Sequence, residues 1–210
     1  MGRFNAISPR TGVSLIMCTD RTGLGLNMVQ TRSLGRSTML AYLRPQFVLD
    51  SVLVIDAAWM GAHRFRALIM DLDNTLVPPH AVEPCGTVRR WHAELLQSGV
   101  RTIVLSNGST ARVAAVCRHL GTTGIGMARK PFRHGYHEAL KRLSVPESEI
   151  LAVGDRLLTD VLGANLMRLA TARVEPLGPD GDASSKVGRA IERWLSRAPA
   201  GPAWIRAPHQ

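Results

Sequence analysis

Short apolar runs alternate with segments of helical periodicity from residue 67 to residue 175, and this alternation constrains the fold more than any other feature. Each helical segment can carry the chain back over one face of a sheet, so that consecutive strands lie parallel. The expected strands are residues 67–72, 102–105, 125–128, 150–153 and 171–175, and the expected helices are 85–98, 110–120, 134–143 and a last one from about residue 160. The sequence therefore predicts an α/β fold with three layers, α/β/α, around a mainly parallel, five-stranded sheet.

The residues that precede this core, which spans 67–178, differ from it in composition. Residues 1–38 are rich in arginine, and Asp20 is their one acidic residue. Such a composition is typical of a transit peptide, but it also fits a disordered extension or a protein whose true start is Met39. All three interpretations place residues 1–38 outside the folded core.

Two further segments flank the core. Residues 39–66 are expected to form a helical lead-in, since apolar residues recur at helical spacing around Pro45. These are Leu40, Leu43, Phe47 and Val48. Residues 179–210 are predicted to form a linker, an amphipathic helix and a tail. One side of that helix is basic (Lys186, Arg189, Arg193 and Arg197), so it either packs on the domain or lies on an anionic membrane.

The net charge of +10 favours anionic partners, which include phosphorylated metabolites, nucleic acid and acidic membrane surfaces. A compositional bias towards arginine explains the charge equally well, because only three of the 26 basic residues are lysine. No run approaches the roughly 18 consecutive apolar residues of a membrane span. We therefore expect a cytoplasmic protein with no transmembrane span, and a peripheral position at a membrane surface stays open.

Simple absences exclude several kinds of phosphoryl-transfer site. Cys18, Cys85 and Cys117 form no C-x-x-C pair, and none has an arginine at the spacing of a cysteine-nucleophile phosphatase loop. No Gly-Lys pair occurs, which excludes a P-loop. These absences leave aspartate as the candidate nucleophile.

Two carboxylates, Asp71 and Asp73, stand at the end of the first expected strand of the core. Like charges buried at one backbone terminus cost free energy through desolvation and repulsion, and a hard divalent cation offsets both costs. Ser106, Lys130 and Asp155 follow the ends of other expected strands. Carboxyl ends of parallel strands share the edge at which open α/β sheets bind ligands. The pattern predicts a phosphoryl-transfer site at this edge.

Four short motifs occur in order along the core: Asp71-Leu72-Asp73-Asn74-Thr75, Ser106-Asn107-Gly108, Lys130-Pro131, and Gly154-Asp155 with Asp160. With them, residues 67–175 resemble the haloacid dehalogenase (HAD) superfamily of aspartate-nucleophile phosphatases. The strings DLDNTLV, ARKP and VGDRLLTDVLGAN are similar to the YqeG-type phosphatases of subfamily IIIA, which are related to mitochondrial phosphatidylglycerophosphate phosphatases. One departure is the second motif, which commonly reads Ser-Asn-Asn. The resemblance implies a HAD-like Rossmannoid fold.

The resemblance also implies roles for the acidic residues. Asp71 would attack phosphorus and form an aspartyl-phosphate, while Asp73 would protonate the leaving oxygen and then deprotonate water. Mg²⁺ would be held by the carboxylates of Asp71 and Asp155 and by the backbone carbonyl of Asp73. Asp160 would support the metal site or the following helix terminus, and Gly154 would allow close approach.

Phosphate contacts are expected from Thr75, Ser106, Asn107 and Lys130. Ser106 and Lys130 would hold the equatorial phosphoryl oxygens, which carry charge in the transition state. Lys130 is one of only three lysines in the chain, and its ammonium group would also offset the repulsion between the carboxylates and an anionic substrate.

The spacing of the motifs leaves no room for a cap domain. Only 30 residues separate Thr75 from Ser106 and only 23 separate Lys130 from Gly154, and each interval is used by one helix and its loops. An open site favours large or anchored substrates, and the resemblance implies phosphatidylglycerophosphate at an anionic membrane surface. Two alternatives stay open: the same chemistry on a soluble or nucleic-acid phosphomonoester, and a non-catalytic module that binds RNA or a protein.

Overall fold

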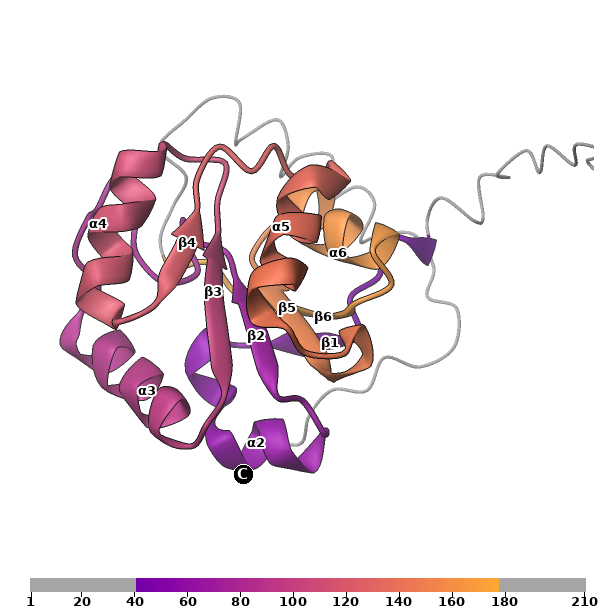
Figure 1. Cartoon of the computed structure of the whole chain (residues 1–210), viewed down its shortest axis with the longest axis horizontal. Helices are drawn as coiled ribbons and strands as arrows, with labels where there is room; N and C mark the ends of the chain where they lie inside the picture. The colour runs from indigo at the N-terminus through magenta and orange to yellow at the C-terminus, as the bar shows by residue number, and fades with distance from the viewer. Residues whose placement is uncertain (1–40, 178–210) are drawn as a thin grey trace, which may run out of the picture. The chain divides into compact units, whose positions relative to one another are not determined.

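The computed structural model of the protein describes residues 41–177 (Figure 1). The chain divides into two compact units, residues 1–41 and 42–210, and the fold below is that of the described part of the second unit. The predictions for residues 1–38 and 179–210 therefore concern residues outside the described range. Among the helices of residues 41–177, none has the length and apolar character needed to cross a membrane.

Six parallel strands form the sheet of this unit (Figure 1). They are β1 (Phe47–Leu49), β2 (Ala67–Met70), β3 (Arg101–Leu105), β4 (Thr123–Ile125), β5 (Ile150–Gly154) and β6 (Ala170–Val174). Their order in the sheet is β1-β6-β5-β2-β3-β4, and every neighbouring pair is parallel. Helices cover both faces, so the predicted three-layer α/β fold is confirmed.

The sheet has six strands rather than the predicted five, because β1 forms where a helical lead-in was expected. Phe47 and Leu49 are buried while Val48 is exposed, which is the alternation of a strand. β1 pairs with β6 in the register Phe47 to Ala172. The helical prediction was wrong at β1, because the open edge of β6 offers backbone partners that the local sequence pattern does not reveal.

Apolar side chains pack on both faces of the sheet. In β2, Leu68 and Met70 belong to one apolar cluster, and Ala67 and Ile69 belong to the other. The first cluster is covered by α2 (Ala57–Ala62), α3 (Gly86–Gln97) and α4 (Thr110–Leu120), and the second by α5 (Arg133–Leu143) and α6 (Leu162–Leu166). Shorter segments are the 3-10 turns η1 (Val52–Val54) and η2 (Glu147–Glu149) and the π-helix η3 (Leu157–Val161). Because β2 is buried on both faces, it is a central strand.

Local signals decide the ends of α4, which has the predicted bounds. The Ser109 hydroxyl oxygen accepts a hydrogen bond from the Arg112 backbone N–H (3.3 Å), and Gly121 ends the helix with a φ of +68°. The neighbouring strand β4 lies at Thr123–Ile125 rather than at 125–128, because it pairs with β3 only there. Residues 126–132 form the loop that leads into α5.

The register brings the carboxyl ends of three central strands to one edge. Met70 of β2 is level with Val104 of β3 and with Val153 of β5. The residues that follow these strands, Asp71, Ser106 and Asp155, therefore share the edge at which open α/β sheets place ligands.

Candidate active site

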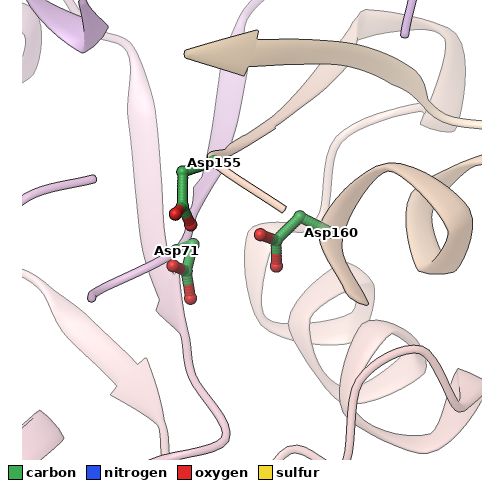
Figure 2. Close-up of side chains that lie close together, drawn as sticks. All are labelled: Asp71, Asp155 and Asp160. Atoms are coloured by element: carbon green, nitrogen blue, oxygen red, sulfur yellow. The ribbon is translucent and has the colours of Figure 1, made fainter. Parts of the chain in front are cut away.

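Three buried aspartates face one another at this edge. Asp71 follows β2, Asp155 follows β5, and Asp160 lies in η3. One carboxylate oxygen from each lies within 4.8 Å of the other two. Figure 2 shows the carboxylates of Asp71 and Asp155 side by side, with Asp160 facing them from its helix. The structure thus brings together the side chains of three of the four aspartates predicted for the site, and the carboxylate of Asp160 is itself part of the cluster.

Lys130 joins two of these aspartates. Its Nζ donates to Asp71 Oδ1 at 2.5 Å and lies 2.7 Å from Asp160 Oδ1. The Lys130 side chain is 4% exposed, so the ammonium group is almost fully removed from water. A charge buried to this extent is stable only when it is paired, and here both partners are carboxylates.

The burial and charge of the cluster shift two pKa values. Burial raises the pKa of Asp71 to about 7, and Asp160 adds to the rise, while Lys130 acts in the opposite direction. Burial also works against the charge of Lys130, but Asp160 and Asp71 outweigh it and raise the pKa of that amine. Lys130 therefore stays protonated, and Asp71 is the member of the pair that gains or loses a proton near neutral pH.

The loop that carries Lys130 is held by the residues that follow β3. The Lys130 backbone N–H donates to Asn107 Oδ1 at 2.6 Å, and Asn107 Nδ2 donates to the Lys130 carbonyl at 3.1 Å. The Ala128 N–H also donates to the Ser106 carbonyl at 3.0 Å. In this geometry the Asn107 side chain positions Lys130, whereas the sequence predicted a phosphate contact for it.

Thr75 and Ser106 are two buried hydroxyl residues near strand ends: Thr75 lies two residues after Asp73, and Ser106 directly follows β3. The Thr75 hydroxyl has no hydrogen-bond partner among residues 41–177, although it is buried. The Ser106 hydroxyl oxygen accepts from the Gly108 N–H at 3.0 Å. A buried hydroxyl without a partner costs free energy, so Thr75 is a donor available to a ligand.

Asp73 does not join the buried cluster. Its side chain is 39% exposed and forms an ion pair with Arg112, whose Nη1 lies 2.7 Å from Asp73 Oδ1. Arg112 is itself anchored, since its Nε donates to the Ala81 carbonyl at 3.0 Å. A guanidinium group from α4 thus holds Asp73 in a partly exposed position outside the buried cluster.

Arg112 is a site residue that the sequence reasoning missed. The signal was its position in the first turn of α4, where a cation opposes the helix dipole unless an acid compensates it. That signal identifies an unusual arginine but not its partner, which lies 39 positions earlier in the chain.

A π-helix turns Asp160 towards the cluster. Asp160 Oδ2 accepts from the Arg156 N–H at 3.0 Å, and the Tyr136 hydroxyl donates to the Asp160 carbonyl at 3.0 Å. Gly154 lies directly against this side chain, because a Cβ on it would stand 2.5 Å from Asp160 Cγ. Single π turns of this kind are frequent at functional sites.

Comparisons with known proteins agree with these features. The family model of haloacid dehalogenase-like hydrolases matches residues 82–167. A protein described as "probable phosphatase YqeG", from Bacillus subtilis, is 27% identical over 157 residues, which are 75% of this chain and 91% of that protein. A chloroplastic phosphatidylglycerophosphate phosphatase 1 from Chlamydomonas reinhardtii is 29% identical over 180 residues, which are 79% of this chain and 67% of that protein.

This match and the two relatives support a place for the chain among the haloacid dehalogenase-like hydrolases. One relative is described as a YqeG phosphatase and the other as a phosphatidylglycerophosphate phosphatase, and the chain is an enzyme of the phosphoric monoester hydrolase class. A solved structure of an uncharacterised protein from Listeria monocytogenes overlaps at a TM-score of 0.44 with 17% identity, covering 63% of this chain and 99% of that one, which is too distant to bear on function.

Hydrolases of this family generally use Mg²⁺, and the donor set of this hydrolase fits such an ion. Asp71, Asp155 and Asp160 offer three hard oxygen ligands, which Mg²⁺ prefers. When all three are ionised, Lys130 balances one charge and leaves two, which matches a divalent cation. The side chain of Asp73 is not part of this set, so only its backbone could contribute.

We expect that Gly154→Ala will impair this hydrolase by displacing Asp160. The added Cβ would overlap Asp160 Cγ, so the carboxylate must move away from Lys130 and the other aspartates. Phosphatase activity should fall roughly 10- to 100-fold and the free energy of unfolding by about 1–3 kcal/mol, measured by phosphate release and urea unfolding.

Gly61→Ala is the matched control, since a Cβ on that helical glycine has nothing within 4 Å. It should preserve activity and stabilise the protein by roughly 0.5–1 kcal/mol. Equal activities for the two variants would contradict the role assigned to Gly154.

Proposed function

We propose that this hydrolase cleaves a phosphomonoester in two steps through an aspartyl-phosphate on Asp71. The observation that carries the proposal is the buried Asp71 carboxylate, held 2.5 Å from Lys130 at the carboxyl edge of the sheet. A carboxylate next to a fixed ammonium group is ready to receive an anionic phosphoryl group, because Lys130 offsets the charge repulsion between them.

In the first step an oxygen of Asp71 bonds to phosphorus, and the bond between phosphorus and the substrate's alcohol oxygen breaks. The departing oxygen takes a proton from Asp73. The half-exposed position of Asp73 supports this role, because a general acid must reach the leaving group from the open side of the site.

In the second step water attacks the phosphorus of the aspartyl-phosphate. Asp73, now ionised, takes a proton from that water, and the bond between phosphorus and Asp71 breaks to release inorganic phosphate and restore the carboxylate. Arg112 supports the exchange by holding the Asp73 carboxylate in one orientation at 2.7 Å.

Three side chains are proposed to bind the phosphoryl oxygens. Lys130 supplies a positive charge, and Thr75 and Ser106 supply hydroxyl groups. The partnerless hydroxyl of Thr75 supports this assignment most directly. Asn107 contributes by holding the backbone of Lys130.

Mg²⁺ is the proposed cofactor. Asp71 and Asp155, with the backbone carbonyl of Asp73, would hold it, and Asp160 would orient the cluster through Lys130 and η3. When bound, the ion would neutralise charge on the phosphoryl oxygens and on Asp71.

The proposed substrate is phosphatidylglycerophosphate, hydrolysed to phosphatidylglycerol at a membrane surface. The name of the relative from Chlamydomonas supports it. The spacing of the elements supports it as well: within residues 41–177, the interval between Thr75 and Ser106 holds only α3 and β3, and the interval between Lys130 and Gly154 holds only α5, η2 and the start of β5. No inserted domain in either interval roofs the site, so the headgroup of a lipid that remains in its bilayer can enter.

Replacement of the nucleophile tests the mechanism. Asp71→Asn should lower phosphate release by at least about 10³-fold, because an amide does not form the acyl-phosphate. The melting temperature should not fall, since the substitution removes a carboxylate whose burial is costly. Asp56→Asn is the control, because Asn caps a helix as well as the Asp that here caps α2. If Asp71→Asn released phosphate as fast as the wild type, Asp71 would not be the nucleophile.

The raised pKa of Asp71 predicts how Mg²⁺ stabilises the protein. Without metal, the pKa of Asp71 is about 7 in the folded protein, whereas an unperturbed Asp, as in the unfolded chain, has a pKa of 3.8, so stability falls as the pH rises between these values. Mg²⁺ binds the ionised carboxylate and should offset this loss. We expect saturating Mg²⁺ to raise the melting temperature by about 3 °C or more at pH 8, and by less at pH 5.5. In Asp71→Asn the difference between the two pH values should shrink, and equal shifts in the wild type would contradict the prediction.

A substrate panel tests the identity of the phosphomonoester. We expect phosphatidylglycerophosphate in vesicles to be hydrolysed with a kcat/KM at least tenfold above that for sugar phosphates, nucleotides and 3′-phosphorylated oligonucleotides, all with Mg²⁺. A preference for one of the soluble or nucleic-acid substrates would be compatible with the proposed mechanism but would show that the substrate is not the lipid.

A further inference from the structure

The loop that carries Lys130 into the site presents apolar and basic side chains to solvent. Along residues 127–133, Ala128 and Lys130 are buried and Pro131 is partly buried, whereas the other four residues are exposed. Met127 is 60% exposed and Phe132 is 70% exposed, the two highest values among the exposed large apolar residues of the described part of the chain. Arg129 and Arg133 are exposed in the same segment.

Neither apolar residue is explained by the stability of the loop. Met127 adopts a φ of +52°, a conformation that is uncommon for long side chains and that Gly or Asn adopts more readily. Phe132 occupies the N-cap of α5 and makes no side-chain cap hydrogen bond, where Ser, Thr or Asp would satisfy a backbone N–H. Because neither side chain adds much to the stability of the fold, a contact outside the fold explains their presence better.

Two neighbouring loops add exposed apolar residues at the same edge of the sheet. Val82, 51% exposed, follows β2 in the loop whose Ala81 carbonyl binds Arg112. Leu177, 47% exposed, follows β6, and its N–H donates to the Asn74 carbonyl at 2.9 Å. Met127 is tied to the same region, because its N–H donates to the Gly108 carbonyl at 2.8 Å. Three loops at the carboxyl edge of the sheet, which also carries the active-site aspartates, thus present apolar side chains to solvent.

We propose that Met127 and Phe132 insert into an anionic lipid bilayer while Arg129 and Arg133 bind its headgroups, so that the open site faces the membrane. The inference rests on the proposed lipid substrate. Exposed apolar side chains interleaved with arginines match the chemistry of such an interface, where apolar groups enter the acyl boundary and cations pair with phosphates. A nucleic acid would use the arginines but leave the apolar residues in water.

The proposed membrane-binding surface, formed by the exposed residues of 127–133, adjoins the active site and is not a separate site. Lys130 lies between Arg129 and Phe132 along the chain, so contact of the loop with headgroups brings the phosphate-binding ammonium close to the membrane surface. A lipid phosphomonoester could then reach Asp71 without leaving its bilayer.

The double variant Met127→Asn/Phe132→Ser tests the proposal on the full chain. Asn tolerates the positive φ at position 127, and Ser can cap α5, so the melting temperature should not fall. Binding to vesicles that contain phosphatidylglycerol, measured by co-sedimentation, should weaken at least tenfold relative to the wild type. Val48→Ser is the control. Val48 is also exposed, but it lies on β1, the outer strand on the far side of the sheet from β4, so this variant should bind vesicles as the wild type does.

The basic residues are tested by Arg129→Asn/Arg133→Gln. These substitutions should weaken binding to anionic vesicles severalfold and leave binding to neutral phosphatidylcholine vesicles unchanged, with the difference disappearing at high salt. Vesicle binding by the apolar double variant that equals that of the wild type would overturn the proposal, as would a loss confined to binding of an RNA oligonucleotide.

Hydrolysis assays separate this inference from the proposed function. The apolar double variant should keep the wild-type rate on p-nitrophenyl phosphate and on phosphatidylglycerophosphate in detergent micelles, and lose at least tenfold on the same lipid in vesicles. Equal losses on all three substrates would mean that the substitutions damage the active site, and would overturn the proposal that this surface contacts membranes. If the wild type does not hydrolyse the lipid in any form, the proposed substrate fails, while the vesicle-binding result still decides whether this surface contacts membranes.

Discussion

The buried ammonium group of Lys130 is the interaction on which the site depends. Three carboxylates meet at the end of an apolar sheet, where their repulsion and desolvation would otherwise push the chain apart or force protonation. Lys130 pairs with Asp71 and Asp160 and stays protonated, so one fixed positive charge holds two elements of the sheet edge together. The remaining negative charge makes the cluster suited to a divalent cation and to chemistry on phosphate.

The loop of residues 126–132 connects this charge to the outside of the molecule. Its inward side is fixed by hydrogen bonds to Asn107 and Ser106, and its outward side carries exposed Met127 and Phe132. Attachment on the inward side leaves the outward side free to carry side chains that add little to the fold. The same segment can therefore position Lys130, the proposed phosphate-binding group, and meet the surface in which the proposed substrate is embedded.

Asp73 and Arg112 show how a second carboxylate is kept apart from the first. Asp71 and Asp73 are two residues apart, yet Asp71 is buried against Lys130, whereas Asp73 is partly exposed and paired with Arg112 of α4. Their environments differ because β2 ends at Met70, just before them, and the backbone then turns, with Asp73 bridging to Val77. These different environments suit the roles proposed for the two aspartates, Asp71 as nucleophile and Asp73 as acid and base.

The sequence by itself determined the α/β alternation, the bounds of α4 and the strand ends at which Asp71, Ser106 and Asp155 meet. These features follow from periodicity, from caps such as Ser109 and Gly121, and from the rule that parallel strands end at one edge. Only the tertiary structure decided that Phe47–Leu49 is a strand, that Arg112 binds Asp73, and that Asn107 holds Lys130. Each of these depends on a partner distant in the chain, and local patterns carry no information about which distant group will be near.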